Sequence, residues 1–274
     1  MISLQNQIEA FEYLFAEYIK YLEIDLANSL INKTKFARNV HLLNDFRNLF
    51  SYALNPKYVE SEKFQQRKKD MTESVEEYCS NAKHIIELKG NIHIDAGLIQ
   101  EIILSNGVFI KKHIEFYFSN IAFSDAFKKS LINKNDFKDY GLLNPKENKK
   151  EYVFVQSLLE FNNALSHLVM AVCKKHKETK EQNIKSAMHH FYRATLDNYK
   201  IIIRFSMHKA QFNEYIQSFL SIRKGEFFLL GKDIQNRKID FYNPVKKRLE
   251  QDKNILNAYK ELFEAIRDLN LKQP

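Results

Sequence analysis

Six polar residues that could do chemistry recur along one predicted helix at steps of three and four. They are His190, Arg193, Asp197, Lys200, Arg204 and His208. Because an α-helix turns once every 3.6 residues, these steps place all six side chains on one face. Five potential cations around one aspartate could bind a phosphate or a nucleic-acid backbone. The alternative is a solvated face on which Asp197 forms weak ion pairs with its neighbours.

A second polar pair, Asn163 and His167, lies on the helix predicted just before this one. The two residues are four positions apart and therefore share a face. The polar turn at 177–180 should fold the two helices into an antiparallel hairpin over 151–209, which brings this pair alongside the other polar residues. We therefore predict one ligand-binding site made of Asn163, His167, His190, Arg193, Asp197 and Lys200. The alternative for His167 is a half-buried packing role.

No motif for a metal or a cofactor is present, and we expect neither. Cys79 and Cys173 are isolated, no histidine pair has zinc-ligand spacing, and glycine-rich phosphate loops are missing. Isolated cysteines are typical of a reducing cytoplasm. The chain also lacks an apolar run of membrane-spanning length and a signal sequence, so we expect a cytoplasmic protein without membrane contact.

The composition predicts the elements that must position these residues. Only 6 Gly and 4 Pro occur among 274 residues, whereas hydrophobic residues make up 45%. Turn-rich β folds and glycine-built nucleotide folds are therefore disfavoured. Apolar residues recur at steps of three and four throughout. We predict an all-α fold of helical bundles and long antiparallel hairpins, with little or no sheet and a helix content of at least about 65%.

Charge and turn residues divide the chain into two predicted parts. A helical bundle over 1–132, a linker over 133–150 and a second bundle over 151–274 are expected. Residues 1–140 hold 18 Lys and Arg against 19 Asp and Glu, whereas residues 141–274 hold 24 against 15. The second half therefore carries a net charge of +9. A basic half attracts anions, of which nucleic acid is the commonest large one.

Three finer boundaries follow from turn signals. Asn106-Gly107 predicts a turn between helices at 96–105 and 108–122. Residues 227–230, between two glycines, are expected to form a short strand or a buried turn, and 225–242 leaves room for a small hairpin. Asn243-Pro244 is expected to precede a last helix over 245–270.

Two sequence segments of the predicted hairpin resemble HEPN proteins. These are NALSHL from Asn163 and AMHHFYRA from Ala187. HEPN proteins are bacterial and archaeal helical bundles, many of them dimeric and many of them ribonucleases in toxin–antitoxin, CRISPR-linked or phage-defence systems. The resemblance covers about residues 151–210 and implies a defence or toxin–antitoxin setting. The family's nuclease signature is an Arg, four to six residues and then a His. Arg204 and His208 come nearest, with three residues between them.

Three functions remain open at this point. The first is a non-catalytic protein whose basic C-terminal half binds RNA, DNA or a nucleotide. The second is a divergent HEPN-type, metal-independent ribonuclease in which His208 acts as acid or base and Arg204 stabilises the phosphate across a dimer. The third is a helical scaffold that binds a second copy or another protein.

Overall fold

The computed structural model describes residues 2–28, 40–88, 92–122, 142–143, 153–173, 177–206, 213–229 and 234–271. Its helices are α1 (Ile2–Ala27), α2 (Val40–Ala53), α3 (Pro56–Val59), α4 (Glu62–Ser80), α5 (Ala96–Ala122), α8 (Val155–Cys173), α9 (Lys177–Ser206), α10 (Asn213–Phe228) and α11 (Ile255–Leu271). Helices account for 80% of the described residues, which confirms the all-α prediction.

Two short antiparallel strand pairs are the described sheet structure. Strand β1 (Leu142–Leu143) pairs with β2 (Val153–Phe154), and β3 (Lys238–Asn243) pairs with β4 (Arg248–Asn254). Apart from β1, the predicted linker 133–150 lies outside the described residues. None of the helices in the described ranges is long and apolar enough to span a membrane.

Polar caps fix where two of the helices begin. The Ser61 hydroxyl accepts a hydrogen bond from the Phe64 amide at 3.2 Å, at the start of α4. The Asp95 carboxylate accepts one from the Leu98 amide at 3.1 Å, so Asp95 caps α5 as its sequence position predicts. Asp95 also pairs with Lys180 at 2.7 Å, which ties the start of α5 to the first turns of α9.

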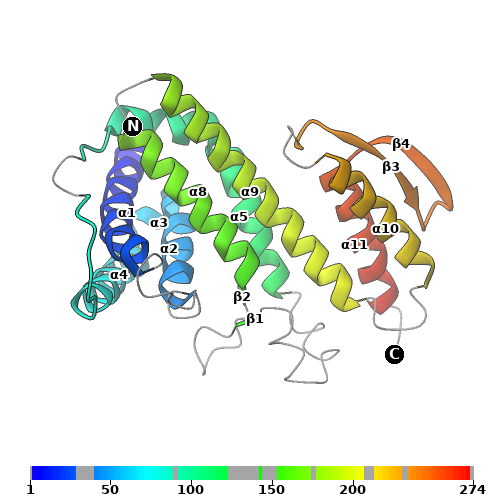
Figure 1. The fold of residues 1–274 in the computed structure, drawn as a ribbon, viewed down its shortest axis with the longest axis horizontal. Coiled ribbons are helices and arrows are strands. Elements are labelled where there is room, and N and C mark those ends of the chain that lie inside the picture. The colour runs from blue at the N-terminus through cyan, green and yellow to red at the C-terminus, as the bar shows by residue number, and fades with distance from the viewer. Residues whose placement is uncertain are drawn as a thin grey trace.

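A long helix joins two hydrophobic cores. The first core is formed by α1 to α5, α8 and the first half of α9, up to Phe191. The second begins at Tyr192 and unites the rest of α9 with α10, α11 and β3. Figure 1 shows α9 running from the N-terminal helices to the end of the molecule where the β3–β4 hairpin covers α10 and α11. The two described cores thus meet within α9.

The predicted turn at Asn106-Gly107 is wrong, because α5 continues through both residues. Ile99, Ile102 and Ile110 are all buried on one side of this helix. Their steps of three and eight residues keep the helical period intact across the glycine. Burial of this continuous stripe outweighs the cost of about 1 kcal/mol for glycine inside a helix.

The predicted last helix, 245–270, is wrong in its first ten residues. The turn after β3 and the strand β4 occupy these residues, and α11 begins only at Ile255. The strand β3 alternates between exposed and buried positions, with Ile239, Phe241 and Asn243 facing inward. The buried Asn243 side chain accepts hydrogen bonds from the amides of Val245 and Lys246, which closes the turn. The small hairpin that we considered for 225–242 is therefore present, but it spans residues 238–254.

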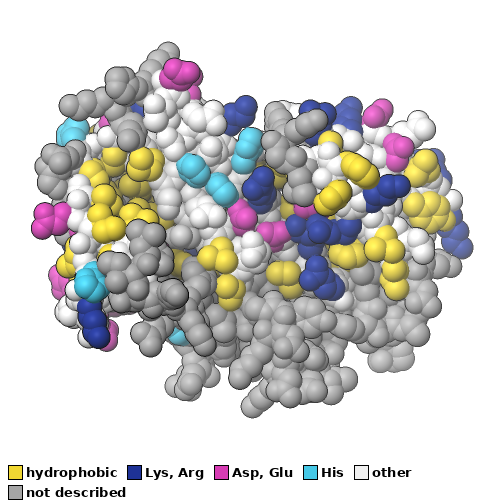
Figure 2. Space-filling model, in the orientation of Figure 1, with side chains coloured by type: hydrophobic (Ala, Val, Ile, Leu, Met, Phe, Trp, Pro, Cys, Tyr) yellow, Lys and Arg dark blue, Asp and Glu magenta, His cyan; other side chains and the backbone are white. Residues whose placement is uncertain are grey.

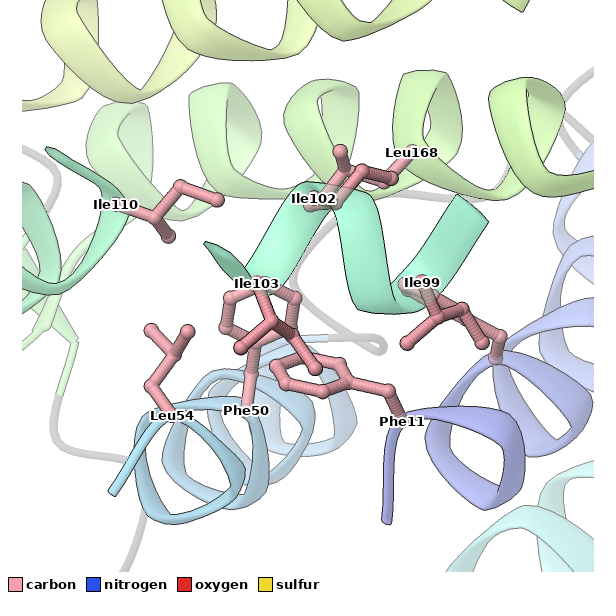
Figure 3. A pocket seen from close by; sticks show the side chains of 9 residues that line it. Phe11, Phe50, Leu54, Ile99, Ile102, Ile103, Ile110 and Leu168 are labelled. Atoms are coloured by element: carbon pink, nitrogen blue, oxygen red, sulfur yellow. The ribbon is translucent and has the colours of Figure 1, made fainter. Parts of the chain in front are cut away.

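A small apolar pocket lies inside the first core. Its lining comes from α1, α2, α5 and α8 and consists of Phe11, Phe15, Phe50, Leu54, Ile99, Ile102, Ile103, Ile110 and Leu168. Figure 3 shows these side chains pointing toward one another between the helices. A void of this kind offers no hydrogen-bond partner and stays dry. We assign it no ligand and treat it as a packing defect.

Gly225 of α10 lies close against Ile239 of β3, and replacing it should be costly. A Cβ atom at this position would lie 2.4 Å from Ile239 Cγ2 and 2.9 Å from its Cβ. We expect Gly225→Ala to lower the free energy of unfolding by about 1–3 kcal/mol, because the strand must move away from the helix. Urea denaturation measures this loss.

Gly107→Ala is the matched control, and its expected effect has the opposite sign. Gly107 is also helical, but the nearest atom to an added Cβ is Ile103 Cγ2 at 4.0 Å. Alanine there should stabilise the protein by up to about 1 kcal/mol. Equal effects of the two substitutions would contradict the close packing of α10 on β3.

Candidate functional site

The predicted polar stripe lies on α9, opposite an apolar face. Met188, Phe191, Thr195, Tyr199 and Ile202 are all buried, as their spacing predicts. The polar residues occupy the other side but do not form one uniform groove. They separate into a histidine end, a central group of ion pairs and an exposed end at Arg204.

The histidine end joins α8 to α9. The rings of His167 and His190 stack with centroids 5.2 Å apart and an interplanar angle of 18°. His190 Nδ1 lies 2.6 Å from the Glu160 carboxylate. His167 Nδ1 lies 2.8 Å from Asn183 Oδ1. The hairpin therefore brings His167 and His190 together as predicted.

The neighbours of the two rings determine which nitrogen carries the proton. Asn183 Nδ2 donates a hydrogen bond to the Thr179 carbonyl at 2.8 Å, so its Oδ1 faces His167 as an acceptor. His167 must then carry a proton on Nδ1. The Glu160 carboxylate likewise accepts a hydrogen bond from His190 Nδ1. Within the described residues, neither Nε2 atom has a hydrogen-bond partner, and both are left for a ligand.

A buried ion network forms the centre of the stripe. Lys200 pairs with Asp197 one turn earlier and, at 2.9 Å, with Glu226 of α10. Arg223 and the Tyr259 hydroxyl bind the second Glu226 oxygen at 2.5 and 2.6 Å. Only 15% of the Lys200 side chain and 7% of the Glu226 side chain are exposed. The network therefore links α9 to α10 and α11 through Lys200, Glu226 and Tyr259. Asp197 and Lys200 are each 15% exposed and offer little surface to a ligand.

The two carboxylates of this network are shifted in opposite directions. Burial raises the pKa of Asp197 above its ordinary value, even though Lys200 favours the charged form. Burial also acts to raise the pKa of Glu226. There, Lys200, the Tyr259 hydroxyl and Arg223 together outweigh burial and lower that pKa. Glu226 is thus the firmly ionised centre of the network.

The remaining predicted residues are accessible. Asn163 and Arg204 are exposed and Arg193 is half-buried. Among the residues that the structure describes, none of these three has a hydrogen-bond or ion-pair partner. The Arg193–Asp197 ion pair that the solvated-face alternative includes is not formed. His208 lies outside the described residues, so the structure does not place it beside Arg204.

An exposed aromatic pair ends α10, where we expected a short strand or a buried turn. Phe227 and Phe228 are 67% and 69% exposed, and their rings meet edge to face at 5.8 Å. Lys224, one turn earlier, is exposed, and Arg223 beside it is 41% exposed. Figure 2 shows hydrophobic and basic side chains interspersed over this end of the molecule. The expectation of a buried segment was wrong, because α10 extends through both phenylalanines.

Sequence reasoning missed the partners that come from other elements. Glu160 lies on α8 and Glu226 on α10, 30 and 26 residues from the residues that they bind. Neither stands in a local motif with its partner. A weak signal was available for Glu160, since it is three residues before Asn163 and so on the same side of α8. No comparable signal exists for Glu226.

Metal ligation finds no support in this region. No group of three or more His, Cys, Asp or Glu side chains in the described part of the chain is arranged to hold a metal ion. No family model, no curated protein and no solved structure matches the chain. The function must therefore be argued from the site itself.

Proposed function

We propose that the protein binds single-stranded nucleic acid through its basic C-terminal half. The observation that carries this proposal is the exposed phenylalanine pair among cations at the end of α10. We define the aromatic surface as Arg223, Lys224, Phe227 and Phe228. Aromatic rings stack on bases of any sequence, while Lys and Arg side chains neutralise the phosphates.

Charge favours this reading over a protein-binding scaffold. The two adjacent exposed phenylalanines are a candidate binding surface, because the other phenylalanines whose side chains the structure describes are buried or half-buried. The second half of the chain carries an excess of nine positive charges, which suits a polyanion. Under this proposal Arg204 supplies charge, and the protein binds RNA or DNA without cleaving it. The resemblance to HEPN proteins favours a bacterial cytoplasm and a defence or toxin–antitoxin setting.

The binding should weaken steeply with salt and depend on the aromatic pair. We expect fluorescence anisotropy to detect binding of short single-stranded RNA or DNA at low salt, with the logarithm of affinity falling by about 0.7 per phosphate contact per logarithmic unit of salt. Phe227→Ser with Phe228→Ser should weaken binding by at least about tenfold, since each stacked base contributes about 1–3 kcal/mol.

A matched pair of exposed apolar residues in the first half provides the control. Leu104 and Val108 of α5 are 63% and 83% exposed. Leu104→Ser with Val108→Ser should leave the affinity unchanged. The proposal fails if wild-type protein binds neither RNA nor DNA at low salt. It also fails if the two double variants behave alike.

A further inference from the structure

We infer that the stacked imidazoles of His167 and His190, with Arg193 and Asn163 beside them, bind the terminal phosphate monoester of a nucleic-acid strand. This end site rests on the proposed function, because it assigns a part of the strand to a second surface. It adds a ligand class and a location that the aromatic surface does not provide.

Access comes from the position of the pair on the surface of the hairpin. The His190 side chain is 19% exposed and His167 is half-buried, so neither ring is sealed in the core. Figure 2 shows histidine side chains at the surface in the middle of the face that carries α8 and α9, with carboxylates and cations next to them. A small anionic group can reach this position from solvent.

The donors around the rings are of the kind that bind phosphate. Arg193 follows His190 by three residues on α9, so the two side chains share a face. Because helical side chains lean toward the N-terminus, we expect the guanidinium to reach toward the turn that carries His190. Asn163 precedes His167 by four residues on the same face of α8. Neither Arg193 nor Asn163 has a partner in the described part of the chain. A guanidinium can bind two phosphate oxygens at once, and the Asn163 amide can donate to a third.

The number of protons favours a monoester over an internal diester. Glu160 and Asn183 occupy both Nδ1 atoms, so each neutral ring presents a bare Nε2 acceptor. An internal phosphodiester carries no proton and offers only acceptors, so it has no donor for a bare Nε2 atom. A phosphate monoester has a second ionisation near about pH 6 and brings its own proton to share with an imidazole.

The test compares strands that differ only at their ends. Unlabelled short RNAs with a 5′-phosphate, a 3′-phosphate or hydroxyl groups at both ends compete against one labelled strand. We expect at least one of the two phosphorylated strands to bind about tenfold or more tightly than the hydroxyl strand, since hydrogen bonds to charged groups have this strength. Comparing the two phosphorylated strands identifies the end. Equal affinity of all three strands would overturn the inference and leave the proposed function intact.

Two sets of variants separate the end site from the aromatic surface. Asparagine retains a donor near the position of Nδ1 but lacks Nε2, so His167→Asn and His190→Asn preserve the bonds to Asn183 and Glu160. Each should remove the end preference without changing the affinity for hydroxyl strands. The Phe227→Ser, Phe228→Ser variant should show the reverse, with weaker binding of every strand and an unchanged preference. His84→Gln, at an exposed histidine outside both surfaces, should change neither.

A measurement on wild-type protein decides the inference even if strands do not bind or the variants fail to fold. A nucleoside 5′-monophosphate and a nucleoside 3′-monophosphate are each titrated while the ring nitrogens are followed by two-dimensional ¹H–¹⁵N NMR. We expect the Nε2 resonances of His167 and His190 to shift with at least one of them and those of His84 to stay constant. If the Nε2 resonances of both rings stay constant in both titrations, the end site is overturned.

Discussion

Lys200→Met should lower the free energy of unfolding at neutral pH by about 3–5 kcal/mol, the usual cost of breaking a buried ion pair. Lys200 is the cation that two carboxylates share, Asp197 on its own helix and Glu226 on α10. Methionine fills a similar volume but leaves both acids without this partner. Arg223 and Tyr259 still bind Glu226, so the loss falls most heavily on Asp197.

The deficit of this variant should shrink as the pH falls. Burial already raises the pKa of Asp197 in the wild type, and removing Lys200 raises it further. A carboxyl whose folded-state pKa lies above its unfolded value stabilises the fold below the unfolded pKa. That contribution is lost as pH rises through the folded pKa. Urea denaturation should therefore show a larger difference from wild type at about pH 7.5 than at about pH 5.

Lys246→Met serves as the matched control on the surface of the same half. Lys246 is 49% exposed and pairs with Glu250 at 2.6 Å, four residues away. Exposed pairs of this type contribute about 0–1 kcal/mol. A deficit of Lys200→Met that equals that of Lys246→Met, or that does not change with pH, would show that the central network is not a buried ion pair.

The helices could be predicted because their apolar residues repeat with the helical period. The antiparallel pair α8 and α9 and the cap at Asp95 follow from residues that are close in sequence. The errors arose where a local turn signal competed with burial. Asn106-Gly107 indicates a turn, but the isoleucines on both sides keep a continuous buried stripe. The alternation of β3 was readable from Ile239 and Phe241, yet the helical pattern of α11 was extended too far back toward them.

The candidate site was predictable only along each helix. The spacing of His190, Arg193 and Asp197 fixed their common face, and the hairpin turn brought His167 to His190. Sequence spacing could not show that Lys200 is buried, because its second partner comes from α10. The exposure of Phe227 and Phe228 could not be predicted from the sequence either, since a run of apolar residues normally predicts burial. Both features depend on how α10 packs on α9 and β3.

The second large effect concerns Phe50, which lies where four helices of the first core meet. Its ring on α2 packs edge to face against Phe11 of α1 at 5.0 Å and against Phe161 of α8 at 5.7 Å, and it lies 5.9 Å from the ring of Phe191 on α9. It also lines the apolar pocket (Figure 3). Truncation to alanine would join the lost volume to an existing void.

Phe50→Ala should therefore lower the free energy of unfolding by about 3–5 kcal/mol, the range for a buried phenylalanine. Phe227→Ala removes the same ring from an exposed position and should change stability by less than about 0.5 kcal/mol. Urea denaturation followed by circular dichroism measures both. Because α9 runs through both cores, we expect the Phe50 variant to unfold in one transition that includes α10 and α11. A second transition that stays at the wild-type urea concentration would show instead that the two cores unfold independently and that α9 does not couple them.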